Sequence, residues 1–168
     1  LFITLMSVLL ALTPIVAQAY GAGRHAEIGE SVRQCAWLAV GLACVALVLL
    51  LNPGPLLALS RLAPELEVRT VAYLDAIAWA VPATLLLRVF AGFSTAVSRP
   101  RAVMVLNLAG LALKVPLNWI FMNGEFGLPA LGAAGCATAT AMIAWLTCGA
   151  AWVWCWREPD FRRYRVFD

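Results

Sequence analysis

The chain has 168 residues, of which 63% are hydrophobic and only 12% are charged, and its mean hydropathy is +0.87. Soluble domains are about 45–50% apolar and about 25% charged, and a domain of this size leaves much of its surface in water. This composition excludes a soluble globular protein, a disordered chain and a collagen-like chain. It predicts a polytopic membrane protein with no nucleic-acid partner. The net charge of +3 is then loop charge that sets the orientation of the protein in the membrane.

Apolar stretches long enough to cross a bilayer as helices, which takes about 20 residues, follow one another along the chain. Period-two alternation is absent, so the predicted fold class is an all-α polytopic membrane protein. We expect one domain of membrane spans over 1–156, followed over 157–168 by a basic cytoplasmic tail or the start of a linker. The predicted spans are 1–20, 35–51, 71–97, 102–122 and 130–156.

The basic residues fix the predicted orientation. The only lysine is Lys114, and the other basic residues are arginines that lie mainly in the connectors. With five spans the connectors alternate sides, so that Arg61 and Arg69 fall on one side and a larger group falls on the other. That larger group comprises Arg24, Arg33, Arg99, Arg101, Arg157, Arg162, Arg163 and Arg165. By the positive-inside rule this side is cytoplasmic, which places residue 1 outside and residue 168 inside a plasma or inner membrane.

The start of the chain predicts missing sequence. The chain begins within an apolar span, without Met and without the basic leader of a signal peptide. An odd number of spans that starts outside predicts that at least one N-terminal helix has been lost. Restoring it gives a six-helix unit with both ends inside, which is the usual half of a duplicated transporter.

No enzyme signature is found. The chain has no phosphate-binding loop with Gly-Lys-Ser/Thr, no HExxH motif, a single histidine (His25), and no CxxC spacing among its five cysteines. We therefore predict no enzymatic activity, no cofactor and no certain metal site.

Polar residues at membrane depth are the best functional candidates. Lys114 lies near the middle of the fourth span, where a charge costs about 2.5–3.5 kcal/mol on insertion scales. At about 100° per residue, Asn107, Lys114 and Asn118 fall within about 40° of one another on one helix face. A lone Asn can simply join two helices, whereas three polar residues on one face predict a lined cavity or an ion path.

Arg88 is a second basic residue at depth. It lies about 16 Å from the cytoplasmic face by helical rise, and we expect it to face the bundle interior. No acidic residue accompanies it within the membrane, since Asp75 lies near the external end of its span and Glu125 lies in a loop. Our hypothesis is that the compensating carboxylate belongs to a helix missing from this chain.

Prolines lie inside three of the predicted spans. Pro14 and Pro82 lie inside spans, and Pro116 lies between Lys114 and Asn118. Such prolines kink a membrane helix and free a carbonyl that neighbouring groups can satisfy. The kinks are read either as ordinary curvature or as hinges for alternating access, and both readings stay open.

A possible gate lies at the end of the first span. Gln18 and Tyr20 precede the small residues Gly21, Ala22 and Gly23, a pattern that is typical of either a helix stop or a functional gate.

Several segments resemble one transporter family. The sequence Pro-Ile-Val-Ala-Gln-Ala-Tyr-Gly-Ala-Gly over 14–23 is similar to the end of the second helix of multidrug and toxic compound extrusion (MATE) transporters. Arg33-Gln34 resembles the start of their third helix, and Arg99-Pro100 resembles the loop after their fourth. The most specific segment, 116–136, resembles the fifth helix, its external turn and the start of the sixth. The whole chain thus resembles helices two to six of the N-terminal lobe, most closely in the NorM-like branch.

The resemblance implies an incomplete twelve-helix transporter made of two six-helix lobes, of which this chain supplies five helices. It implies export of organic, often cationic drugs across the lipid bilayer, driven by H⁺ or Na⁺, and it implies that the missing first helix and C-terminal lobe are partners without which the fragment is inactive. Asn118 matches a polar position of the family's fifth helix, and Cys136 stands where some members have Thr. Lys114 stands where many members carry Asn, and this departure disfavours a Na⁺ site near Asn118. The family has an Asp in its first helix, which is missing here, and a pair between Lys114 and that Asp fits H⁺ coupling better.

Two further readings stay open. A lipid-linked precursor flippase of the same superfamily would rely on several basic residues in a central cavity, whereas only Arg88 and Lys114 are available here. A non-transporting membrane scaffold would not need Asn107, Lys114 and Asn118 on one face.

Overall fold

The computed structural model describes residues 2–52, 64–123 and 133–158, and this part of the chain is helical throughout apart from short turns, with no strand. The helices are α1 (Phe2–Leu10), α2 (Leu12–Gly21), α3 (His25–Leu51), α5 (Pro64–Ala78), α6 (Ala80–Ala96), α7 (Pro100–Asn123) and α8 (Ala133–Arg157). Four stretches are long and apolar enough to cross a membrane: Thr4–Gly21, Glu27–Leu51, Pro100–Asn123 and Ala134–Arg157. The bent pair Thr70–Ala78 and Ala80–Ala96 supplies a fifth, which confirms the all-α multi-pass fold class.

Two of the three prolines break their spans as the sequence predicts. Pro14 lies in the first turn of α2, and the first span is interrupted at Ala11. Pro82 lies in the first turn of α6, where the helix axis bends by 41° at Trp79. Each break lies three residues before its proline, because the ring clashes with the preceding turn and the proline has no N–H to donate. Pro116, in contrast, lies inside an unbroken α7.

Helix α3 begins earlier than hydropathy predicts, at His25 rather than at residue 35. Charged and polar residues lower the hydropathy of the first turns of α3, but Ile28 and Val32 in these turns are buried in the core, and side-chain pairs on the helix surface add to its stability. Gln34 Nε2 donates to Glu30 Oε1 at 3.2 Å, and Arg24 pairs with Glu27 at 3.1 Å. Helix α8, in contrast, begins at Ala133, after the predicted start of the fifth span at residue 130. Residues 130–132 lie outside the described part of the chain.

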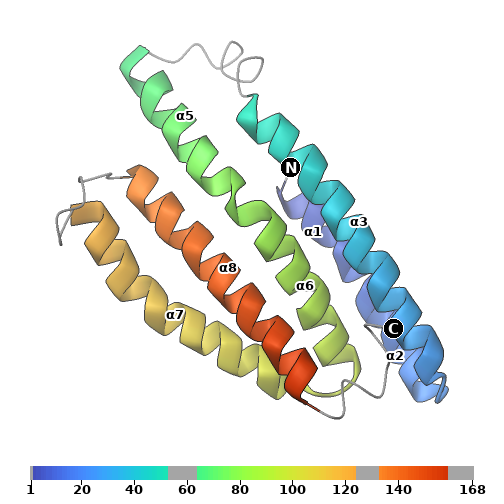
Figure 1. The fold of residues 1–168 in the computed structure, drawn as a ribbon. Helices are drawn as coiled ribbons and strands as arrows, with labels where there is room; N and C mark the ends of the chain where they lie inside the picture. The colour runs from blue at the N-terminus through green and yellow to red at the C-terminus, as the bar shows by residue number, and fades with distance from the viewer. Residues whose placement is uncertain (1, 53–63, 124–132, 159–168) are drawn as a thin grey trace.

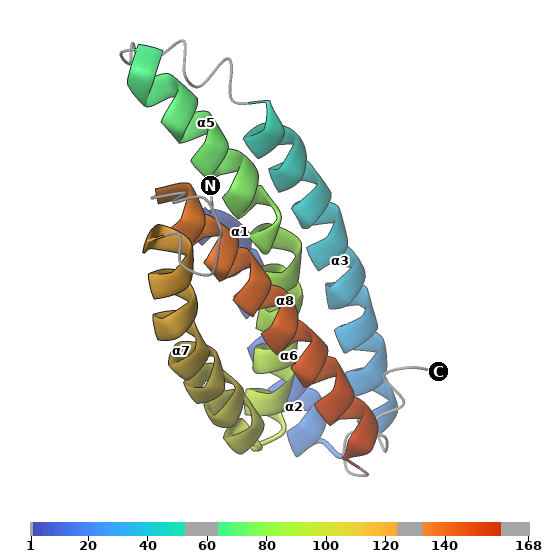
Figure 2. The same cartoon turned by 60° about the vertical axis from the view of Figure 1, so that its left-hand side comes forward.

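Helix α6 is the centre of the bundle, between α1, α2 and α3 on one side and α8 on the other (Figure 1). A cluster of large apolar side chains joins it to the N-terminal helices, and its most buried members include Leu9, Val16, Ile28, Leu85 and Phe93. Small residues join α6 to α8, where Ala80 and Ala83 meet Ala141 and Ala144. Helix α7 lies at the edge, packed mainly on α8 (Figure 2), and only 11% of its span is buried within this chain.

The described arginines of the larger predicted group lie at one end of the bundle, whereas Arg61, Arg162, Arg163 and Arg165 lie outside the described part of the chain. Helices α2, α6 and α8 end, and α3 and α7 begin, at the same end of the bundle (Figure 1). We call this the basic end, because it carries exposed arginines. They are Arg24, Arg33, Arg99, Arg101 and Arg157.

Candidate functional site

The polar residues of α7 lie beside the line along which this helix contacts α8. Ala102, Leu106 and Gly110 are the buried positions of α7. A Cβ atom at Gly110 would lie only 3.1 Å from Thr147 Cγ2, so the missing side chain permits close approach of the two helices. By helical geometry Asn107, Lys114 and Asn118 are centred about 60° around the helix from Gly110. The contact with α8 therefore fixes which way the polar stripe faces.

Lys114 and Asn118 are both half-buried. Asn118 Oδ1 is buried and has no hydrogen-bond partner within the described residues. Over the same residues Lys114 makes no ion pair, since the one ion pair found there joins Arg24 to Glu27. A buried acceptor without a donor and a half-buried cation without an anion both cost free energy unless a further group meets them. Within the described residues, these two are thus the part of the predicted site that is incomplete.

Asn107 and Arg88 are exposed within the described part of the chain. Asn107 lies on the predicted face, but its side chain is exposed rather than buried. Arg88 is exposed within the described part of the chain too, and its Nη2 donates to Met6 Sδ at 3.1 Å, so that its orientation toward the interior of a complete bundle stays a prediction. Helical spacing correctly groups residues by face, but it does not say which faces a neighbouring helix covers.

Cys136 lies in the second turn of α8 and is half-buried. Its carbonyl oxygen accepts a hydrogen bond from Thr140 Oγ1 at 2.8 Å. Thr138 and Thr95 also return their hydroxyls to backbone carbonyls of their own helices. A functional role of Cys136 stays a prediction.

The segment around Gln18 and Tyr20 forms a helix stop. Their carbonyls accept hydrogen bonds from Ala22 N–H at 3.0 Å and Gly23 N–H at 3.1 Å, and Arg24 N–H reaches the carbonyl of Ala19 at 2.9 Å. Gly23 adopts a positive φ of 70°, which completes the left-handed C-terminal turn. The side chains of Gln18 and Tyr20 are exposed, and a gating role for them, or for Pro14 and Pro116 as hinges, stays a prediction.

Sequence reasoning missed a hydrogen-bond donor at the break in the third predicted span. Trp145 of α8 donates its indole Nε1–H to the carbonyl oxygen of Trp79 at 2.9 Å, at the bend that precedes Pro82. Pro82 has no N–H to donate to the carbonyl of Ala78, and the Trp145 indole, 66 residues away in the chain, donates to the next carbonyl, that of Trp79. Ser94 was missed as well: it is fully buried, and within the described residues its Oγ has no hydrogen-bond partner.

The family follows from comparison with known proteins. The family model described as MatE matches residues 1–120, which include α1 to α6 and most of α7. The chain belongs to the MatE family. The match includes both proline breaks and the polar stripe of α7, so these features lie within the part of the chain that defines a MatE protein.

Curated MatE relatives carry names that refer to drug resistance. The chain is 41% identical over 97% of its length to the probable multidrug resistance protein NorM of Aromatoleum aromaticum, and 36% identical over 97% to the multidrug resistance protein NorM of Aliivibrio fischeri. It is 38% identical over 82% of its length to the multidrug resistance protein MdtK of Edwardsiella ictaluri. The chain spans 35%, 35% and 30% of these three relatives, or about a third of their length.

Proposed function

We propose that the chain forms part of one lobe of a secondary multidrug efflux transporter, which exports organic, often cationic compounds in exchange for H⁺ or Na⁺. The observation that carries this proposal is the similarity of 97% of the chain to proteins named multidrug resistance protein NorM. The polar stripe at membrane depth on α7 supports it from the structure. The proposed location is a plasma or inner membrane, with the basic end in the cytoplasm.

The partners of this chain are further helices of the same transporter. Only 11% of the α7 span is buried here, and Lys114 and Asn118 on that helix need polar groups that no described residue supplies. A preceding helix that places a carboxylate against Lys114 would meet the first need. We propose in addition that the chain does not transport by itself, because a substrate pathway requires both lobes.

The half-buried lysine favours H⁺ as the coupling ion. A Na⁺ ion held beside the ammonium of Lys114 would be repelled by it, most strongly where the dielectric constant is low. A carboxylate paired with Lys114 can instead take up a proton, which breaks the pair and shifts the balance between two states of the lobe. Na⁺ bound near Asn118 is the alternative that the experiment below separates.

The test is efflux of a fluorescent organic cation in inverted membrane vesicles that contain the complete protein. Imposed pH and Na⁺ gradients are applied separately. We expect the pH gradient to drive transport, and we expect Lys114→Met and Asn118→Leu to lower coupled transport by about tenfold or more, the usual scale of a coupling between two sites. Lys114→Arg keeps the charge and should retain part of the activity.

Asn123→Leu is the matched control, because Asn123 is exposed at the end of the same helix. It should transport like the unchanged protein. A scaffold would tolerate all four substitutions, and transport that persists after both gradients have been collapsed would contradict secondary transport. Transport driven by Na⁺ alone would overturn the H⁺ assignment and leave the efflux assignment intact.

A further inference from the structure

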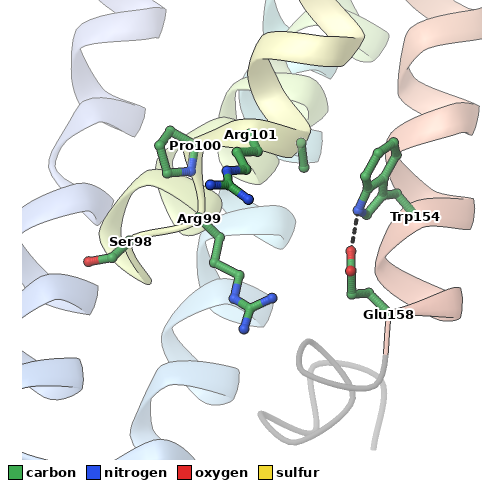
Figure 3. Close-up of a pocket in the computed structure, with 7 residues that line it drawn as sticks. Ser98, Arg99, Pro100, Arg101, Trp154 and Glu158 are labelled. Atoms are coloured by element: carbon green, nitrogen blue, oxygen red, sulfur yellow. Dashed lines mark hydrogen bonds between the residues drawn. The ribbon is translucent and has the colours of Figure 1, made fainter.

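A hollow of about 570 Å³ opens at the basic end, between the turn that joins α6 to α7 and the last turn of α8 (Figure 3). It is separate from the polar stripe of α7, because Lys114 and Asn118 do not line it. Its walls are formed by Ser98, Arg99, Pro100, Arg101, Ala102, Trp154 and Glu158.

The first wall is positively charged and is held by backbone geometry. Ser98 has a φ of 59°, Ser98 N–H donates to the carbonyl of Thr95 at 3.1 Å, and Arg99 N–H donates to that of Ser94 at 2.8 Å. This left-handed turn ends α6 and lets α7 begin at Pro100, so that Arg99 and Arg101 both line the hollow. The first turn of α7 adds backbone N–H groups without intrahelical acceptors, which carry partial positive charge.

The opposite wall is aromatic and negatively charged. Trp154 donates its indole Nε1–H to Glu158 Oε2, and both residues are half-buried (Figure 3). The other oxygen, Glu158 Oε1, accepts no hydrogen bond from any described residue. No ion pair joins Glu158 to Arg101 across the hollow, again within the described part of the chain. The two walls therefore present opposite charges to the space between them.

We propose that this hollow binds the headgroup of a phospholipid that carries a phosphate and a primary ammonium, the phosphatidylethanolamine class. The Arg101 guanidinium can form paired hydrogen bonds with phosphate oxygens, and Arg99 adds positive charge beside it. An ammonium at the opposite wall can donate to Glu158 Oε1 and lie against the ring of Trp154. The hollow lies at the ends of membrane-spanning helices, where headgroups are found, and basic pockets between such helices bind lipid headgroups.

The carboxylate selects among lipid classes. A purely anionic headgroup or a free phosphate would meet Glu158 as a like charge and would bring no ammonium to offset it. A choline headgroup has the positive charge but no N–H group to donate. The proposal rests on the membrane location of the bundle and does not depend on transport or on the coupling ion.

The test is retention of lipids by the full-length protein in native mass spectrometry. The protein is equilibrated in detergent with equal amounts of phosphatidylethanolamine, phosphatidylcholine and phosphatidylglycerol that carry the same acyl chains. We expect phosphatidylethanolamine to be retained best. Arg99→Gln and Arg101→Gln should each lower its retention about fivefold, the usual contribution of one basic residue at a lipid surface. Glu158→Gln should remove the preference over phosphatidylcholine and leave phosphate recognition intact.

Two further variants make the result specific. Arg24→Gln removes the same charge from the basic end without touching the hollow, and it should retain lipid like the unchanged protein. Arg101→Lys keeps the charge and loses the paired geometry, so its retention should lie between the two extremes; it also tests the proposal if Arg101→Gln does not fold.

Three results would overturn the proposal. One is equal retention of the three lipids with no response to Arg99→Gln or Arg101→Gln. Another is a preference for phosphatidylglycerol, which would mean that the site selects lipids by their negative charge alone. The third is complete displacement of phosphatidylethanolamine by millimolar inorganic phosphate, which would identify a site for the free ion.

Discussion

Ser98 and Gly23 occupy the same backbone position at the ends of two helices. Both follow a helix with a left-handed φ, 59° at Ser98 and 70° at Gly23, and both are followed by an N–H that bonds back five residues, Arg99 to Ser94 and Arg24 to Ala19. Glycine adopts this conformation without steric cost, whereas a residue with a Cβ is strained in it.

We predict that Ser98→Gly stabilises the protein by about 1 kcal/mol and that Gly23→Ala destabilises it by about the same amount. Unfolding in detergent micelles, followed by loss of helical circular dichroism, measures both changes. The control is Ser31→Gly, because Ser31 lies inside α3 and glycine weakens a helix interior. If Ser98→Gly lowered stability as Ser31→Gly should, strain at Ser98 would not be the governing term.

The third span shows how one element depends on another. The span bends by 41° at Trp79, and the indole of Trp145 in α8 donates to the Trp79 carbonyl at this bend at 2.9 Å. We predict that Trp145→Phe, which keeps an aromatic side chain but removes the donor, destabilises the bundle by about 0.6 kcal/mol and by no more than about 1.7 kcal/mol, the range found for hydrogen bonds between membrane helices.

A double-mutant cycle with Pro82→Ala isolates this effect. Without the proline the helix can satisfy its own carbonyls, so Trp145→Phe should cost little in that background. Trp156→Phe, at an exposed position of the same helix, serves as the control. If Trp145→Phe lowered the stability equally with and without Pro82, the contribution of the hydrogen bond would not depend on the proline break.

At the scale of the whole molecule, patterns that follow from local chemistry are predictable, and features that depend on distant segments are not. Membrane spans follow from hydropathy, and the shared face of Asn107, Lys114 and Asn118 follows from helical spacing. The exposure of Arg88 and the indole donor to Trp79 depend on which helices pack side by side, and a single sequence does not encode that in any local pattern. The early start of α3 was not predicted because Glu27, Glu30 and Arg33 lower the hydropathy of its first turns.

The separation of charge between the two ends of the bundle predicts its orientation in the membrane. The described arginines at the basic end are exposed, and positively charged loops stay in the cytoplasm. In a variant whose five native cysteines are replaced by alanine, Asn52→Cys and Asn123→Cys should react with a membrane-impermeant maleimide on intact cells. Ala22→Cys and Ser98→Cys should react only in inverted vesicles, because they lie in the turns at the basic end. Labelling of Ser98→Cys on intact cells would place the basic end outside, and the proposed direction of efflux and H⁺ entry relative to this bundle would then be reversed.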